Sequence, residues 1–342
     1  MKITRAKSTA SLRAFTSSAL FRVGLGIVVS VLTLWLAARN VSIESLQAAF
    51  TQANLGYVGL ALLVLGVSTY AKAVRWKILV GSAGQAIPLS KYFAIHVVGQ
   101  MLNILIPARV GDLSRAYVLG GMGPGRAFTL GTIVIEKFLD MVGYALIFVL
   151  LLLLMPLPAW VYQSAAVLAI AGGVVVLLLA VLAFARAWFV QMCERLLMWL
   201  PEGLRTKVLR LVEASFASLH VLRQRNDLFW LIVWTAVVWV TAALINYSIL
   251  LALNIDVAST APLLLLVALQ AGITIPSAPG KIGVFEWICE RVLVLVYGIA
   301  SVAALSYGIL LHTVTLVPII LLGLILFWQM GLSGTNLPRE QD

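Results

Sequence analysis

Residues 127–155 read AFTLGTIVIEKFLDMVGYALIFVLLLLLM, and this stretch decides the fold class. A helix of this length exceeds the roughly 30 Å of hydrocarbon in a bilayer, and nearly all of its side chains are apolar. The whole chain has the same character, because 62% of its 342 residues are hydrophobic, 11% are charged, and the mean hydropathy is +1.05. Soluble domains average about half apolar and a quarter charged residues. The sequence therefore predicts an all-α polytopic membrane protein.

Other apolar runs along the chain predict further helices. Six of them are long enough to cross a bilayer: 20–38, 55–73, 160–184, 228–252, 284–300 and 304–328. We therefore expect about seven transmembrane helices. Two more apolar segments, 88–106 and 261–278, contain or adjoin Pro and Gly and end in polar turns. Such interruptions favour broken or re-entrant helices over plain spans.

The distribution of basic residues predicts the orientation. The chain carries 24 Lys and Arg against 13 Asp and Glu, a net charge of +11. Most of the basic residues fall before the first span, after the second, around the 88–106 segment, or within 186–227. The positive-inside rule places all of these segments, and the N-terminus, in the cytoplasm. Basic loops that face anionic lipid explain the charge excess, so a nucleic-acid partner is disfavoured.

The sequence offers no pattern for a metal, a cofactor or a disulfide framework. Cys193 and Cys289 are its only cysteines, too few for a Cys-based metal site. No His-Glu-x-x-His, Asp-x-Asp or Gly-x-Ser-x-Gly motif occurs, which weakens metal-assisted transfer and hydrolysis. The polar stretch 186–227 has apolar residues at helical spacing, which predicts an interfacial amphipathic helix or a helix packed on the ends of the spans.

Two short motifs suggest an internal repeat. Residues 107–111 read PARVG and residues 279–283 read PGKIG, so each has Pro, a small residue, a cation, a β-branched residue and Gly. Each motif ends an interrupted apolar segment between two full spans, and the predicted topology gives the two copies opposite orientations. We therefore expect an inverted repeat, which places a substrate site near the bilayer midplane. The expected turn or hinge residues are Pro107, Gly111, Pro279, Gly280 and Gly283.

These features predict one membrane domain over 20–330, with short tails at 1–19 and 331–342. Within it, the first copy of the repeat covers about 55–155 and the second about 228–328. The first apolar run has a long charged leader and Arg39 directly after it, which favours an uncleaved anchor over a secretory signal.

Four longer motifs carry a resemblance to a known family. They are RWKIL at 75–79, NILIPARVGDLSR at 103–115, EKFLD at 136–140 and PGKIGVFE at 279–286. In this combination the chain, over about 20–330, resembles the lysylphosphatidylglycerol synthase transmembrane-region family, the flippase-like proteins that include YbhN. Relatives usually have two glycines after the Pro of the last motif, whereas Lys281 stands at the second of these positions.

The resemblance implies a lipid-moving membrane domain, found alone or fused to a soluble aminoacyl-transferase domain. No such soluble domain is present in this sequence, so we expect no synthase activity and no enzyme. The resemblance favours a multi-pass protein of the bacterial inner membrane.

Charges at membrane depth cost about 2.5–3.5 kcal/mol on insertion scales, so they are candidates for function. We expect four cations to bind the phosphate of a substrate: Arg75, Arg109, Arg115 and Lys281. A facing arrangement of Lys281 and Arg109 would form a bipartite anion site. In the structural alternative, Asp112 pairs with Arg109 or Arg115 at the turn, while Lys72 and Arg75 extend toward lipid headgroups.

Five carboxylates are candidates for proton coupling or for ion pairs: Asp112, Glu136, Asp140, Glu286 and Glu290. Glu136 and Asp140 lie four residues apart on one helix face and would repel unless Lys137, Arg109 or Lys281 approaches, or one is protonated. Glu286 and Glu290 repeat this spacing. His96 and His312 lie in apolar runs, where proton transfer or simple packing are the alternatives.

These observations predict a transporter that moves an anionic phospholipid or a polyprenyl-phosphate-linked lipid between leaflets. The expected partner is a membrane lipid with an anionic headgroup. Two alternatives stay open, namely a membrane-embedded headgroup or glycosyl transferase and a non-catalytic subunit of a cell-envelope assembly. Each of these three functions is compatible with a homo-oligomer or with partners from cell-envelope biosynthesis.

Overall fold

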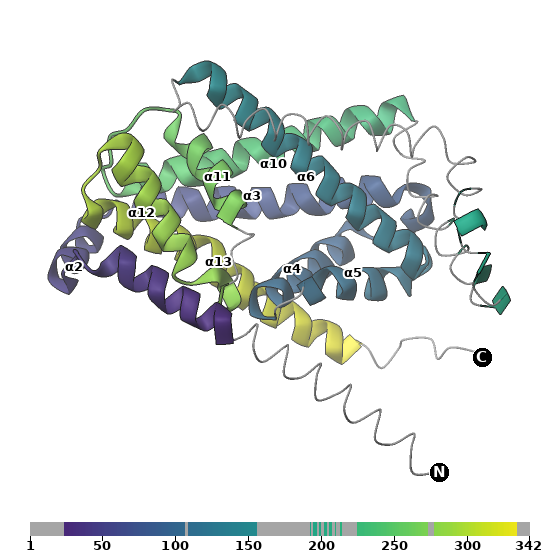
Figure 1. The fold of residues 1–342 in the computed structure, drawn as a ribbon. Coiled ribbons are helices and arrows are strands. Elements are labelled where there is room, and N and C mark those ends of the chain that lie inside the picture. The colour runs from purple at the N-terminus through teal and green to yellow at the C-terminus, as the bar shows by residue number, and fades with distance from the viewer. Residues whose placement is uncertain are drawn as a thin grey trace, which may run out of the picture. The chain divides into compact units, whose positions relative to one another are not determined.

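The computed structural model describes residues 24–106, 109–155, 224–272 and 277–333, and twelve positions between 192 and 213. This part of the chain is helical and contains no strand (Figure 1). After a first helix, Gly24–Ala38, come α2 (Ile43–Thr51), α3 (Leu55–Val80), η1 (Gly81–Gly84), α4 (Leu89–Leu105), α5 (Val110–Gly120), α6 (Arg126–Leu154), α10 (Arg225–Ala252), α11 (Ala261–Gly272), η4 (Pro279–Lys281), α12 (Val284–Tyr297) and α13 (Ser301–Ser333). The predicted all-α fold class is confirmed.

Four of the described helices are long and apolar enough to span a membrane: Leu55–Gly84, Arg126–Leu154, Arg225–Ala252 and Ser301–Gly331. The pair Gly24–Ala38 and Ile43–Thr51, bent by 77°, counts as a fifth span if taken together. These helices cover five of the seven predicted runs.

The other two predicted runs have different outcomes. The predicted span 284–300 forms the 14-residue α12, which at 1.5 Å per residue is about 21 Å long and too short to cross alone. Gly298 ends it in the left-handed conformation with φ 68°. The predicted run 160–184 lies outside the described residues, as do most of 186–227, the tail 1–19 and residues 334–342 of the predicted C-terminal tail, whose first three residues belong to α13.

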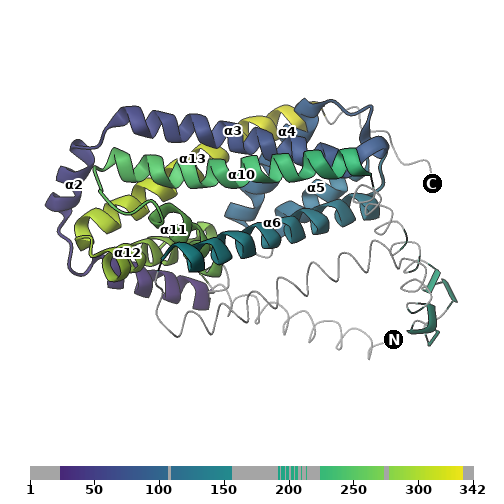
Figure 2. The ribbon, with the colours of Figure 1, turned by 90° about the horizontal axis from the view of Figure 1, so that it is seen from above.

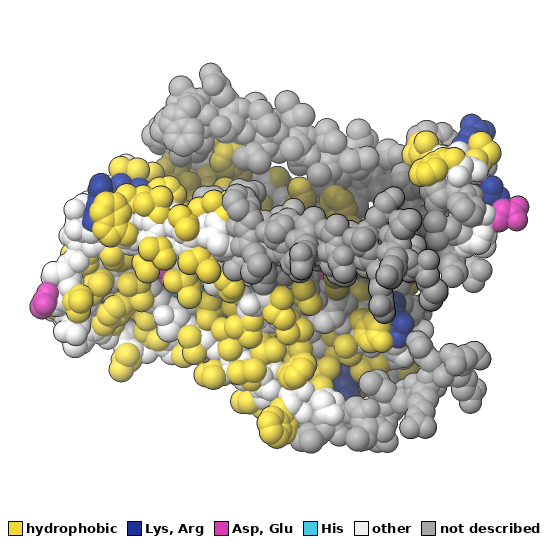
Figure 3. All heavy atoms as spheres, turned by 60° about the horizontal axis from the view of Figure 1, so that its bottom comes forward, with side chains coloured by type: hydrophobic (Ala, Val, Ile, Leu, Met, Phe, Trp, Pro, Cys, Tyr) yellow, Lys and Arg dark blue, Asp and Glu magenta, His cyan; other side chains and the backbone are white. Residues whose placement is uncertain are grey.

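Large apolar side chains cover the outer surface of the described helices. Leu153, Leu55 and Trp328 are more than two-thirds exposed, and hydrophobic side chains gather over most of the described surface in Figure 3. An exposed apolar surface of this extent requires a nonpolar surrounding. Together with the spans, it identifies a multi-pass membrane protein.

The described helices divide into two compact units, one within residues 1–59 and 246–314 and the other within residues 60–245 and 315–342. In the second unit, α4 and α5 form a hairpin, and α5 contacts both α4 and α6 (Figures 1 and 2). The hairpin needs glycine where its backbones meet, because a Cβ on Gly111 would lie 1.8 Å from the carbonyl oxygen of Gly99. Trp76, which is fully buried, anchors the core and meets the ring of Tyr92 edge-on at 5.4 Å.

In the first unit, the turn before α12 packs on the helix Gly24–Ala38. The backbone N–H of Ala278 donates to Ser30 Oγ at 2.8 Å. A Cβ on Gly283, whose φ is 89°, would lie 2.1 Å from the carbonyl oxygen of Ser30. Tyr307 donates to Asn246 Oδ1 at 2.7 Å and thereby links α13 to α10 inside the bundle. Glycine at 283 is therefore required twice, by its backbone conformation and by this close approach.

The two halves of the chain share an element order. A long helix, two shorter ones and a second long helix recur as α3–α4–α5–α6 and α10–α11–α12–α13. The predicted interrupted segments 88–106 and 261–278 contain α4 and α11, each followed by a reversal of the chain. At both reversals the cation is left-handed, with φ 54° at Arg109 and 60° at Lys281. Non-glycine residues rarely adopt this conformation.

Candidate functional site

Helices α3, α5 and α6 bring seven ionisable side chains together inside the second unit. We call this set the charge cluster; its members are Lys72, Arg75, Asp112, Arg115, Glu136, Lys137 and Asp140. The cluster lies among apolar helices, where each charge is expensive unless it is paired. Its internal pairing therefore decides which charges are neutralised.

Arg115 and Glu136 form the most complete pair. Arg115 Nη1 and Nη2 donate to the two carboxylate oxygens of Glu136 at 3.2 and 2.6 Å. Both side chains are almost fully buried, at 2% and 4% exposure. The guanidinium also lies over the ring of Trp76, 4.1 Å from the ring centroid. Bidentate geometry and an aromatic face are the interactions that best compensate a buried arginine, so this pair clamps α5 to α6 and α3.

Arg75 and Asp140 form a less complete pair. A single bond of 2.8 Å joins Arg75 Nη2 to Asp140 Oδ1. Arg75 is 1% exposed, whereas Asp140 is 28% exposed. Arg75 Nε and Nη1 are buried and have no hydrogen-bond partner among the described residues. Most of the donor capacity of this guanidinium is therefore unused.

Asp112 holds the start of α5 in place. It accepts a hydrogen bond from Asn103 Nδ2 at 3.1 Å and lies 3.7 Å from Arg115 Nη1 and 3.6 Å from Lys137 Nζ. A carboxylate in the first turn of a helix also interacts favourably with the helix dipole. Asp112 is thus a structural link between the α4–α5 turn and the charge cluster.

The structure resolves the repulsion expected between Glu136 and Asp140. Each carboxylate binds a different arginine, Arg115 and Arg75, rather than the predicted Lys137, Arg109 or Lys281. The expected extension of Arg75 toward lipid headgroups is not observed, because its side chain is buried and directed at Asp140. Sequence reasoning missed that Lys72 belongs to the cluster. The sequence feature that could have revealed this is the three-residue spacing between Lys72 and Arg75, which places both side chains on one helix face.

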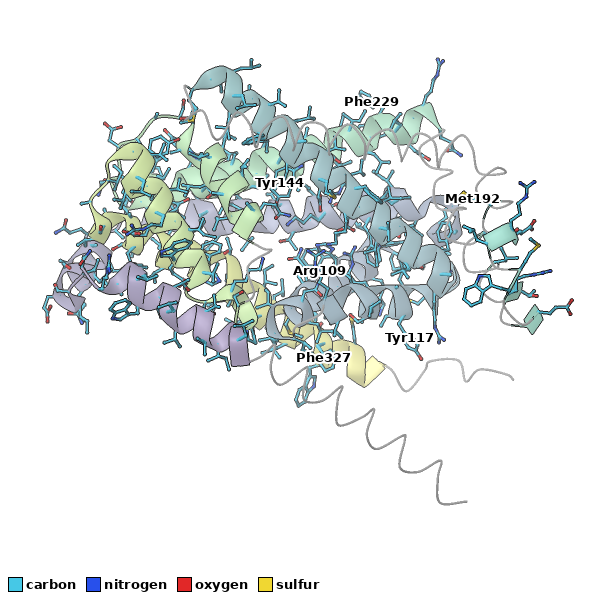
Figure 4. All side chains as sticks on the ribbon, in the orientation of Figure 1. Arg109, Tyr117, Tyr144, Met192, Phe229 and Phe327 are labelled. Atoms are coloured by element: carbon cyan, nitrogen blue, oxygen red, sulfur yellow. The ribbon has the colours of Figure 1, made fainter. Side chains whose placement is uncertain are left out.

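Arg109 is the N-cap residue of α5, at the turn between α4 and α5 (Figure 4). Its side chain is exposed, and no carboxylate of the described residues lies within 4 Å of it. The preceding Pro107, a predicted hinge residue, lies outside the described residues. Gly111 is helical and serves the close approach to α4 rather than the turn itself.

A second arrangement of ionisable groups follows the turn in the other unit. Glu286 Oε2 accepts the backbone N–H of Gly283 at 2.6 Å, and Glu286 Oε1 is hydrogen-bonded to His312 Nδ1 at 2.6 Å. The ring of Phe285 stacks on His312, with centroids 4.3 Å apart. Glu286 therefore caps α12 and ties it to α13.

Glu290 has a different partner from Glu286. Its two oxygens accept hydrogen bonds from Arg291 Nε at 2.5 Å and Nη2 at 2.8 Å. Lys281 lies half-buried at the turn, after Pro279 and Gly280 of η4. The facing of Lys281 and Arg109 stays a prediction.

No group of three or more His, Cys, Asp or Glu that could hold a metal ion occurs in the described part of the chain. His96 is buried and hydrogen-bonded through Nε2 to Gln100 at 2.6 Å. The candidate functional groups of the described residues are therefore cations, carboxylates and one imidazole–carboxylate pair.

The apolar helices and their intramembrane ion pairs define a polytopic membrane domain. The family model described as lysylphosphatidylglycerol synthase TM region matches residues 23–323, and the chain belongs to this family. The predicted family resemblance is thereby confirmed, and the domain is of the flippase-like type. Neither a curated protein nor a solved structure matches the chain significantly.

Proposed function

We propose that this protein moves an anionic lipid, either a phospholipid or a polyprenyl-phosphate-linked lipid, between the leaflets of the bacterial inner membrane. The observation that carries the proposal is the charge balance of the charge cluster. The charge cluster contains four basic side chains and only three carboxylates, so its basic side chains outnumber its acidic ones by one. A charge in such surroundings is costly, and an anionic headgroup that enters the cluster would neutralise it. No soluble synthase chemistry is needed for this function.

The recurring element order supports the transport part of the proposal. We take α3–α6 and α10–α13 as two copies of an inverted repeat, with the N-terminus in the cytoplasm. Rocking of one copy against the other would then open the substrate site to each leaflet in turn. Arg109 and Lys281, one at each turn, would supply further phosphate contacts.

If transport is driven by protons, Glu286 is the best-supported carrier in the proposal. It is buried and shares a short hydrogen bond with His312, so two titratable groups can exchange one proton. Glu136, by contrast, is paired at both oxygens with Arg115, whose guanidinium does not give up its proton.

Leaflet exchange in proteoliposomes tests the proposed function. Fluorescent phosphatidylglycerol, a polyprenyl phosphate and phosphatidylcholine would be compared, with a membrane-impermeant quencher to report the outer leaflet. We expect the protein to accelerate exchange of the anionic lipids at least about tenfold more than that of phosphatidylcholine, because electrostatic pairing favours them by more than 1.4 kcal/mol. No exchange of any anionic lipid by folded, inserted protein would overturn the proposal. Conversion of lipid in detergent, where no leaflets exist, would instead identify a transferase.

A further inference from the structure

The two buried arginines of the charge cluster differ in how completely they are bound. Arg115 uses Nη1 and Nη2 on Glu136 and presents its face to Trp76, which leaves only Nε without a partner. Arg75 uses Nη2 alone, and both Nε and Nη1 lack a partner among the described residues. An unsatisfied buried donor costs about 1–3 kcal/mol. Arg115 therefore has a structural role, whereas Arg75 has free N–H groups that can donate to another acceptor.

The surroundings of Arg75 favour an anionic acceptor over a neutral one. Lys72 lies three residues before Arg75 on the same face of α3 and forms no ion pair within 4 Å among the described residues. Lys72 and Arg75 are thus two basic side chains on one face of α3, and Asp140 is the one carboxylate of the described residues that pairs with either of them within 4 Å.

Asp140 is the exchangeable member of this group. It makes only one hydrogen bond to Arg75 and is 28% exposed, so it lies on the open side of a guanidinium that is itself 1% exposed. One free N–H group lies on each side of the bonded Nη2, at Nε and at Nη1. Once Asp140 leaves Nη2, a tetrahedral oxyanion can accept at once from Nη2 and from one of its free neighbours, Nε or Nη1, which is the bidentate arrangement that a single carboxylate oxygen leaves unused.

We propose that Lys72 and Arg75 form the phosphate subsite of this protein, and that the phosphoryl oxygens of the ligand displace Asp140 from Arg75. The proposal rests on the proposed function for the identity of the ligand as a lipid. Arg75 supplies the directional hydrogen bonds, Lys72 balances charge without fixed geometry, and Asp140 neutralises the site between ligands. A headgroup phosphate and free phosphate share this chemistry, so the test must separate them.

Binding measurements on the full-length protein in detergent test the subsite independently of transport. The probes are short-chain phosphatidylglycerol, inorganic phosphate and short-chain phosphatidylcholine, measured by thermophoresis or native mass spectrometry. We expect Asp140→Asn to bind phosphatidylglycerol more tightly than wild type, because the competing carboxylate charge is gone. Arg75→Gln is expected to weaken binding by about 10- to 100-fold, the value of one lost charged hydrogen bond. Lys91→Gln, an exposed cation on α4, is the matched control and should bind normally.

A structural role for the Arg75–Asp140 pair predicts a different pattern. Both single variants would then lower stability and binding together, whereas the subsite predicts opposite effects on binding. If Arg75→Gln fails to fold, the double variant Arg75→Gln/Asp140→Asn keeps a neutral hydrogen-bonded pair and is compared with Asp140→Asn alone. Equal phosphatidylglycerol affinity of these two proteins would overturn the subsite.

The remaining outcomes separate the two proposals. Normal lipid exchange with unchanged binding in Arg75→Gln would overturn the subsite and leave the transport function standing. Loss of binding in Arg75→Gln without any exchange by wild type would overturn the function and leave an anion site. Inorganic phosphate that binds as tightly as phosphatidylglycerol would identify the ligand as a free anion rather than a lipid headgroup.

Discussion

Glu136→Gln provides the most direct test of the clamp between α5 and α6. The substitution removes the negative charge but keeps the shape of the side chain, so Arg115 loses its counter-ion while remaining buried. Breaking a buried pair costs about 3–5 kcal/mol. One amide carbonyl still accepts from Arg115 and restores about 1 kcal/mol. We therefore expect the free energy of unfolding to fall by roughly 2–4 kcal/mol.

Unfolding by sodium dodecyl sulfate in mixed micelles, followed by circular dichroism, measures this difference. Glu44→Gln is the matched control, because Glu44 is exposed in the first turn of α2 and its loss should cost at most about 0.5 kcal/mol. An apolar replacement of both partners, Arg115→Met with Glu136→Leu, should cost less than Glu136→Gln, since no unpaired charge remains. If Glu136→Gln lowers the free energy of unfolding by less than about 1 kcal/mol, Glu136 does not neutralise a buried Arg115 and the reasoning is refuted.

Three further predictions follow from the packing and the turns. Gly111→Ala should disrupt the α4–α5 hairpin, because its Cβ would lie 1.8 Å from the carbonyl oxygen of Gly99. Size-exclusion profiles of this variant should show aggregation. The control is Gly59→Ala, where the added Cβ has open space, and matching profiles of the two variants would contradict the close approach. Lys281→Gly should raise the midpoint of thermal unfolding, because a left-handed non-glycine residue costs about 1–2 kcal/mol; a lower midpoint would mean that contacts of the lysine side chain outweigh the backbone term. Trp76→Phe removes the indole N–H that donates to a buried threonine and weakens the aromatic face beneath an arginine. We expect the free energy of unfolding to fall by about 1–2 kcal/mol in the same micelle assay. An unchanged free energy of unfolding would exclude both interactions.

The sequence motifs located the turns correctly but did not reveal their geometry. The repeated Pro, small residue, cation, β-branched residue and Gly pattern predicted two reversals, and both occur. The motif suggested that Gly111 is a hinge, yet this residue is helical and its requirement comes from a neighbouring backbone. Close approach between helices depends on partners far from the motif, so a local pattern cannot distinguish it from a flexible turn.

The candidate site was only partly predictable for a similar reason. Intramembrane charge marked Arg115, Glu136 and Asp140, because the cost of burying each is a property of the residue and its apolar run. Arg75 was marked by the RWKIL motif of the family resemblance. Their pairing was not predictable. Arg75 and Asp140 are 65 positions apart in the chain, and nothing in the spacing of either motif shows that they meet.

The sequence by itself determined the fold class and the family of this protein. Membrane spans depend on the length and hydropathy of continuous segments, and backbone groups in lipid must bond within their own helix, so local sequence is sufficient. Only the tertiary structure decided which charges neutralise one another. The packing of α3, α5 and α6 gave Arg115 two acceptor oxygens and Arg75 one. That difference depends on distances of a few tenths of an ångström between helices, and hydrogen bonds are sensitive on this scale whereas hydropathy is not.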